Sequence, residues 1–170
     1  MFRLSATALL VLALAAPQAL ADDRHHGQVK RIQLSGAQED PTVITDGRGS
    51  ATLRIQGASL VYDVRYLDLE SDIEQAHIHI GDDDTTGGIA AFLCSDLGNG
   101  PAGTASCPPA PGRLTGAIVA SEVIGPAAQG VPPGNIAKLI RAVRAGLVYI
   151  NIHTVGSPAG EIRGDVKRDR

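Results

Sequence analysis

Aromatic side chains are scarce in this 170-residue chain, which has three tyrosines, two phenylalanines and no tryptophan. Proteins that bind single-stranded nucleic acid stack the bases on exposed aromatic rings, and this sequence has too few of them. An excess of positive charge is also absent, because 15 Lys and Arg residues stand against 18 Asp and Glu residues. A phosphate-neutralising surface is therefore not expected, and the sequence predicts no nucleic-acid partner.

The motifs of several common enzyme classes are absent as well. The sequence contains no nucleophile-elbow serine, no phosphate-cradling glycine motif and no His pair with a Glu between them on a helix. Ser157 lies close to His153 and Glu161 along the chain, but the flanking glycines Gly156 and Gly160 are typical of a turn. We therefore expect a protein that is not an enzyme, and keep a metal-dependent redox enzyme as an alternative.

The composition indicates one folded domain. Hydrophobic residues make up 44% of the chain and charged residues 19%, which is close to the average of globular proteins. With 20 Gly and 10 Pro, the chain has many turns. Its core must be built mostly from Ile, Leu, Val and Ala.

The N-terminal segment is typical of a secretory signal peptide. A basic start at Arg3 precedes an apolar run over residues 9–16, which Pro17 ends, and residues 19–21 form a small-x-small cleavage site. We expect a signal peptide over residues 1–21, a flexible leader over 22–28, a single β domain over 29–166 and a polar tail over 167–170. The alternative is a buried N-terminal helix. No later apolar run is long enough to span a bilayer, so the expected mature protein is exported, periplasmic or extracellular, without a transmembrane segment.

Cys94 and Cys107 are the only two cysteines. Export would place them in an oxidising compartment, which favours a disulfide between them. The glycine-rich segment that separates them would then be closed into a loop. The alternative is a pair of free thiols that act as metal ligands.

Alternation of apolar and polar residues predicts a mainly β fold. Strands are expected over residues 29–34, 51–56, 60–64, 76–80, 89–93, 114–119, 147–153 and 161–166. One short helix is expected near residues 135–145, because apolar residues there recur at three- and four-residue steps. Asn135 is placed to cap its N-terminus, and Gly146 to end it. Closely spaced strands with one helix predict an antiparallel β-sandwich or open barrel.

Three histidines fall on predicted strands. His77 and His79 are two residues apart, so both side chains point to the same side of the strand, while Ile78 and Ile80 point to the other. The same alternation in residues 149–153 places His153 on the polar side, facing outward. If the two strands are neighbours, the three imidazoles converge.

Three imidazoles are a common set of ligands for copper or zinc. The sequence therefore offers His77, His79 and His153 as a metal site, in which binding weakens below about pH 6.5 because neutral imidazole is the ligand form. The alternative is that each imidazole hydrogen-bonds to a nearby loop or to a carboxylate such as Asp82 or Glu161.

Four ordered blocks of sequence resemble the chordin (CHRD) domain family. They are Leu34-Ser35-Gly36-Ala37-Gln38-Glu39, Ala76-His77-Ile78-His79-Ile80-Gly81, Tyr149-Ile150-Asn151-Ile152-His153-Thr154 and Gly160-Glu161-Ile162-Arg163-Gly164. Residues 123–130 resemble the microbial members of the family. The resemblance extends from about Val29 to Val166.

In animal chordin such domains belong to an extracellular antagonist of bone morphogenetic proteins, and microbial members are exported and have one domain. The resemblance makes the three histidines, Glu161 and Arg163 the distinctive polar positions. Glu161 and Arg163 share a strand face and are expected to pair with each other or with a neighbouring turn, in a structural or binding role. The His-x-His block also resembles the copper strand of copper–zinc superoxide dismutases, but this chain lacks the further histidine ligands.

Two functional hypotheses follow. The first is an exported, non-enzymatic CHRD-like β-sandwich module with a binding or structural role and an unidentified partner. The second is a copper- or zinc-binding protein that uses His77, His79 and His153.

Overall fold

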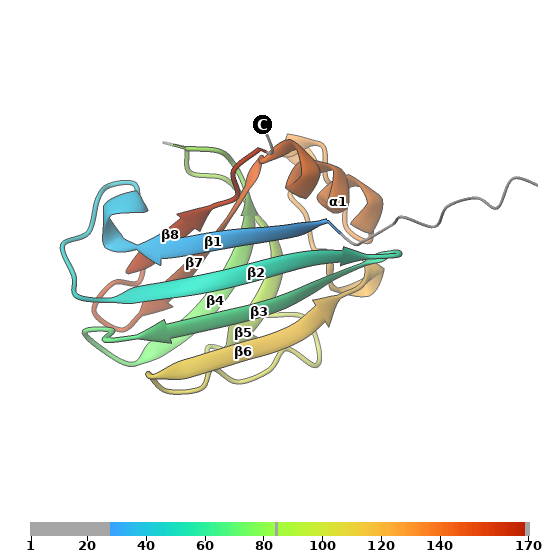
Figure 1. Cartoon of the computed structure of the whole chain (residues 1–170). Helices are drawn as coiled ribbons and strands as arrows, with labels where there is room; N and C mark the ends of the chain where they lie inside the picture. The colour runs from blue at the N-terminus through green and yellow to red at the C-terminus, as the bar shows by residue number, and fades with distance from the viewer. Residues whose placement is uncertain (1–27, 84, 169–170) are drawn as a thin grey trace, which may run out of the picture.

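The structure is a computed structural model that describes residues 28–83 and 85–168 (Figure 1). The expected signal peptide and nearly all of the expected leader lie outside these residues. The described residues form one α-helix, α1 (Ile136–Ala145), and eight strands: β1 (Val29–Ser35), β2 (Arg48–Gln56), β3 (Ser59–Leu67), β4 (Ile73–Ile80), β5 (Ile89–Ser95), β6 (Gly112–Ile118), β7 (Val148–Thr154) and β8 (Ile162–Asp165). The predicted mainly β fold with one short helix is confirmed.

All strand pairs are antiparallel, in the order β5-β4-β7-β8-β1-β2-β3-β6. The sheet folds over into two layers, with β1, β2, β3 and β6 in the front layer of Figure 1 and the other four strands behind. A single residue pair, Ser35 with Arg163, joins the layers where β1 meets β8. On the opposite side, the terminal strands β5 and β6 contact each other. The result is a nearly closed β-sandwich.

The core lies between the two layers and follows the predicted alternation. Leu53, Leu60 and Val64 of the front layer and Ile78 and Ile150 of the back layer have no exposed surface. Burial of each such side chain stabilises the fold by about 1.5–3 kcal/mol. This inward set fixes which side chains of each strand must lie on the outer faces.

Helix α1 covers one end of the sandwich (Figure 1). The side chain of Asn135 accepts a hydrogen bond from the Lys138 amide at 3.0 Å, which caps the first turn. The helix ends at Gly146, whose left-handed conformation (φ 67°) suits glycine. Among the described residues, no helix has the length and apolar character needed to cross a membrane.

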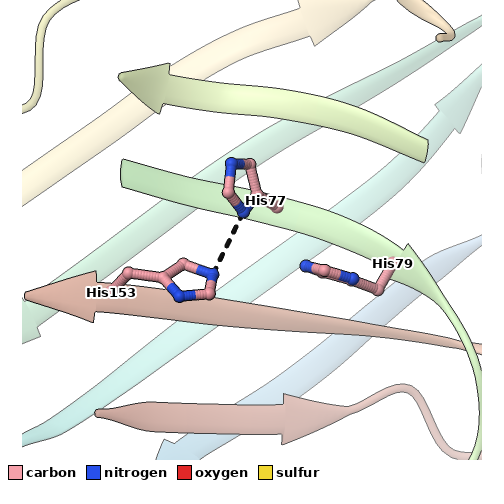
Figure 2. Close-up of side chains that lie close together, drawn as sticks. All are labelled: His77, His79 and His153. Atoms are coloured by element: carbon pink, nitrogen blue, oxygen red, sulfur yellow. Dashed lines mark hydrogen bonds between the residues drawn. The ribbon is translucent and has the colours of Figure 1, made fainter. Parts of the chain in front are cut away.

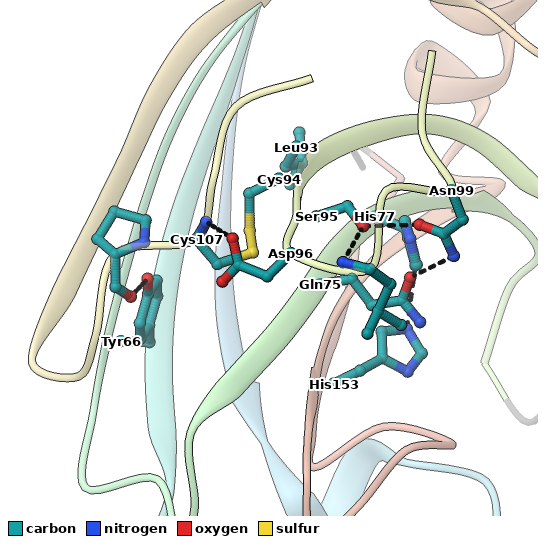
Figure 3. Close-up of a disulfide and its surroundings, with 12 residues drawn as sticks. Tyr66, Gln75, His77, Leu93, Cys94, Ser95, Asp96, Asn99, Cys107 and His153 are labelled. Atoms are coloured by element: carbon teal, nitrogen blue, oxygen red, sulfur yellow. Dashed lines mark hydrogen bonds between the residues drawn. A yellow bond between two sulfur atoms is a disulfide. The ribbon is translucent and has the colours of Figure 1, made fainter. Parts of the chain in front are cut away.

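A disulfide between Cys94 and Cys107 ties the end of β5 to the segment that leads into β6 (Figure 3). The two Cα atoms are 5.1 Å apart. The Cys107 amide also donates to Asp96 at 3.2 Å, and the Tyr66 hydroxyl donates to the Pro108 carbonyl. The bridge therefore closes the side of the sandwich at which β5 and β6 meet.

Candidate metal centre

The three histidines lie on the outer face of the back layer. Strand β4 pairs with β7 so that His77 is opposite Asn151, His79 is opposite Tyr149, and Gln75 is opposite His153. His153 is therefore the diagonal neighbour of His77. The structure brings together the three imidazoles that the alternation placed on one side, and one ring nitrogen of each lies within 4.8 Å of the others (Figure 2).

This outer face, on which the alternation places His153, is covered by loops. The exposed fractions of His77, His79 and His153 are 1%, 7% and 7%. The loop between β4 and β5 lies against His79, and the turn after β7 lies against His153, as their backbone contacts with Gly87 and Pro158 show. Alternation separates the two faces of a strand but does not indicate whether a loop covers the outer one.

Hydrogen bonds to backbone carbonyls define the protonated nitrogen of two rings. The Nδ1 atom of His79 lies 2.8 Å from the Gly87 oxygen, and the Nδ1 atom of His153 lies 3.1 Å from the Pro158 oxygen. A carbonyl oxygen only accepts, so each Nδ1 carries the proton and each Nε2 is an acceptor. The Asn151 amide, whose oxygen is placed 3.0 Å from Nε2 of His153, must then direct its NH2 group toward that nitrogen. Nδ1 of His77 lies 3.1 Å from Nε2 of His153, and it must therefore be the donor of that bond.

Two lone pairs remain without a partner as a result. Nε2 of His77 and Nε2 of His79 are buried and have no hydrogen-bond partner among the described residues. A buried polar atom without a partner costs about 1–3 kcal/mol. The cluster therefore holds two buried acceptors that have no hydrogen-bond partner among the described residues.

The imidazoles are neutral at physiological pH. Burial, together with the neighbouring imidazoles of His153 and His79, lowers the pKa of His77 to about 3. Burial lowers the pKa of His79 to about 4 and also lowers the pKa of His153. All three rings are thus in the form that binds a metal ion.

A three-layer stack supports one side of the cluster. The Tyr149 ring lies parallel to the His79 ring, with 4.7 Å between the ring centroids, and the Arg163 guanidinium lies 3.6 Å from the centroid of Tyr149. Arg163 is 1% exposed and donates twice to Asp165 Oδ1, at 2.7 and 3.1 Å. It also donates to the carbonyls of Asp82 and Thr85, at 2.7 and 3.0 Å, and so holds the covering loop in place.

Glu161 and Arg163 were expected to pair with each other or with a neighbouring turn. They do not bond to each other in the structure, and each bonds to a loop instead. Glu161 accepts from the hydroxyls of Thr45 and Thr154, at 2.8 and 2.7 Å, and from the amide of Glu70 at 2.9 Å. Its carboxylate thus fastens two loops to the end of β7.

The sequence reasoning missed three side chains of this face. Phe92 meets His77 edge to face, with ring centroids 4.4 Å apart, and Asp165 neutralises Arg163. Glu39 is 8% exposed, its Oε1 atom has no described hydrogen-bond partner, and burial raises its pKa to about 7 against the opposing effect of Arg163. Asp165 could have been found by alternation from Arg163, whereas no local pattern marks Glu39.

Taken together, these elements define a class: an antiparallel β-sandwich in which one outer face carries a buried polar cluster around three histidines. A family model described as the CHRD domain matches residues 31–166, so the chain belongs to the CHRD domain family. No curated protein and no solved structure matched the chain.

Proposed function

We propose that this CHRD domain is an exported, non-enzymatic module that binds one zinc or copper ion at His77, His79 and His153. Export is supported by the basic and apolar pattern of residues 1–21 and by the disulfide, which suits an oxidising compartment. Sequencing the N-terminus of the mature protein tests this part, with Asp22 expected as the first residue.

One observation carries the metal assignment: ring nitrogens of the three buried imidazoles lie within 4.8 Å of one another, and the Nε2 lone pair of His79 has no described partner. Histidine ligands of metal ions commonly donate their other ring N–H to a backbone carbonyl or carboxylate. His79 and His153 make such bonds with Gly87 and Pro158. A metal ion would use the Nε2 lone pair of His79, which otherwise costs the fold stability.

The distances allow such an ion after a small adjustment. Ligand nitrogens about 2.0–2.1 Å from a tetrahedral zinc ion lie about 3.4 Å apart. His77 Nδ1 and His153 Nε2 are already 3.1 Å apart, and the whole set lies within 4.8 Å. An ion bound there would replace the proton between these two nitrogens, and His77 would then carry its proton on Nε2. Closing the set requires the rings to move by about 1 Å.

The burial of the cluster favours a structural or storage role over catalysis. The three imidazoles are at most 7% exposed, so a substrate does not reach an ion held between them without movement of the covering loop. Closed zinc sites of this kind contribute to folding, whereas catalytic sites keep a position open to substrate.

Metal titration tests the proposal on a chain that carries His25→Ser and His26→Ser. The chain has five histidines, so this background retains only the cluster. We expect the background chain to bind Zn²⁺ or Cu²⁺ with Kd below about 1 µM and to unfold at a higher temperature with the ion. Adding His79→Gln should weaken binding by at least about 100-fold, because one ligand is lost.

Phe92→Leu in the same background is the matched control, since Phe92 packs on His77 but offers no ligand. This variant should retain most of the affinity. Failure of the background chain to bind either ion, or equal binding by the His79→Gln variant, would contradict the metal assignment and leave a CHRD module without a metal.

A further inference from the structure

The outer face of the front layer carries five exposed arginines, of which Arg48 of β2 pairs with Asp68 at 2.6 Å. The other four, one from each strand, are Arg31 of β1, Arg54 of β2, Arg65 of β3 and Arg113 of β6, and we call this surface the arginine face. It lies on the layer nearest the viewer in Figure 1. The chain as a whole has a net charge of -3, so this positive surface is a local feature.

The arrangement of these arginines is unfavourable for the isolated domain. Arg65 and Arg113 are direct cross-strand partners, and like charges placed opposite each other destabilise a sheet. Asp63 supplies the one carboxylate of this face among the described residues. It accepts from Arg113 at 2.9 and 2.7 Å and lies 3.6 Å from Arg65.

Arg31 and Arg54 have no ion-pair partner among the described residues. They are diagonal neighbours on β1 and β2, because Arg31 is opposite Thr52 and Arg54 is opposite Val29. Four guanidinium groups thus share one carboxylate. The remaining positive charge is available to a bound anion.

Small hydroxyl side chains separate the arginines and leave the face hollowed. Two neighbouring hollows, of about 240 and 600 Å³, share Thr52 and Asp63 in their linings. Ser50 lines the smaller one and Thr115 the larger. Guanidinium groups bind carboxylates and sulfates with paired hydrogen bonds, while hydroxyl and carboxylate groups can bond to the hydroxyls of a sugar.

We propose that the arginine face binds an acidic polysaccharide, whose carboxylate or sulfate groups contact the arginines and whose hydroxyls contact Thr52, Asp63 and Thr115. Nucleic acid suits the face less well, because single-stranded binding relies on aromatic stacking. The tyrosines of β3, Tyr62 and Tyr66, are buried on the inner side. This proposal does not depend on a metal at the histidines.

Binding of the full chain to dextran sulfate and alginate tests the proposal, with uncharged dextran as the reference polymer. We expect binding to at least one acidic polymer at low salt, no binding to dextran, and weakening as NaCl is raised. The double variant Arg31→Ser/Arg54→Ser should lose at least about 10-fold in affinity. Both side chains are exposed and have no ion-pair partner in the part of the chain that the structure describes, so the variant should fold normally.

The matched control is Arg141→Ser/Arg144→Ser on α1, which removes the same charge from two other exposed positions. This control should bind like the unaltered chain. Equal loss in both double variants would overturn the proposal, because net charge alone would then explain binding. The proposal would also be overturned if neither acidic polymer bound, or if duplex DNA bound equally tightly.

Discussion

The two outer faces of the sandwich come from the same alternating pattern but have opposite environments. Arg163, on the back layer, is 1% exposed and is bonded to Asp165 and to two backbone carbonyls. Arg113, on the front layer, keeps 54% of its side chain exposed although it also pairs with a carboxylate. The difference lies in what covers each face: loops lie over the back layer, and the front layer is open.

The comparison shows that burial on an outer face requires partners for most of its polar groups. The back face has them for most of its atoms, through the stack of Arg163 on Tyr149 and through backbone carbonyls. Four arginines that share one carboxylate do not meet this requirement. The front face therefore stays exposed to solvent unless an anion binds to it.

The largest expected effect on stability comes from replacing one arginine on each face by methionine. Arg163→Met should lower the free energy of unfolding by about 3–5 kcal/mol, because Asp165 is left as an unpaired buried charge. Arg113→Met, at an exposed pair, should change it by less than about 1 kcal/mol. Urea unfolding of both variants measures the contrast, and similar losses would refute the distinction between the faces.

The next effect is a pH dependence that belongs to the covered face alone. His77 and His79 have pKa values of about 3 and about 4 when folded, below the ordinary value of 6.5. The unfolded chain therefore binds more protons, and stability present above pH 6.5 is lost as the pH falls toward 4. From pH 7 to 5.5 the free energy of unfolding should fall by about 1 kcal/mol for each of these two histidines.

Glu39 acts in the opposite direction over the same range, because its folded pKa of about 7 exceeds the ordinary value of 4.5. Its contribution to stability is largest below pH 4.5 and is lost as the pH rises through 7. Urea unfolding of the Glu39→Gln variant at pH 7 and 5.5, without metal, isolates the histidines. If the free energy of unfolding of that variant were the same at pH 5.5 as at pH 7, the buried state of the imidazoles would be contradicted.

The smallest effect is expected on the front face. Arg65→Thr removes one of two like charges that face each other across β3 and β6, and it leaves Asp63 paired with Arg113. The free energy of unfolding should stay unchanged or rise by no more than about 0.5 kcal/mol. Urea unfolding at low and at high NaCl checks this, since salt should abolish any gain. A loss above 1 kcal/mol would mean that Arg65 is needed by the fold.

Much of the fold could be predicted from local sequence. Alternation placed Ile78 and Ile150 inside, and the capping residues Asn135 and Gly146 located the helix. The two cysteines were matched because no other partner exists for either. These features depend on residues close together in the chain or, for the cysteines, on there being only one possible pair.

The candidate site was only partly predictable. Alternation showed that His77 and His79 share a face, but the pairing of β4 with β7 joins segments about 70 residues apart. The covering loop has no periodicity, and its contacts through the carbonyls of Asp82 and Gly87 are independent of side-chain type. Sequence therefore indicated which groups could meet, and not that they would be shielded from water.

The backbone of Arg163 forms the ladder pair at which β1 meets β8, and its side chain holds the loop whose Gly87 carbonyl orients His79. Closure of this side of the sandwich and alignment of the imidazoles are thus coupled through Arg163. An insertion or deletion in β1 that shifts its register would misalign His79 without altering any residue near it. Conversely, an ion held by the histidines would resist separation of the layers at the junction of β1 and β8.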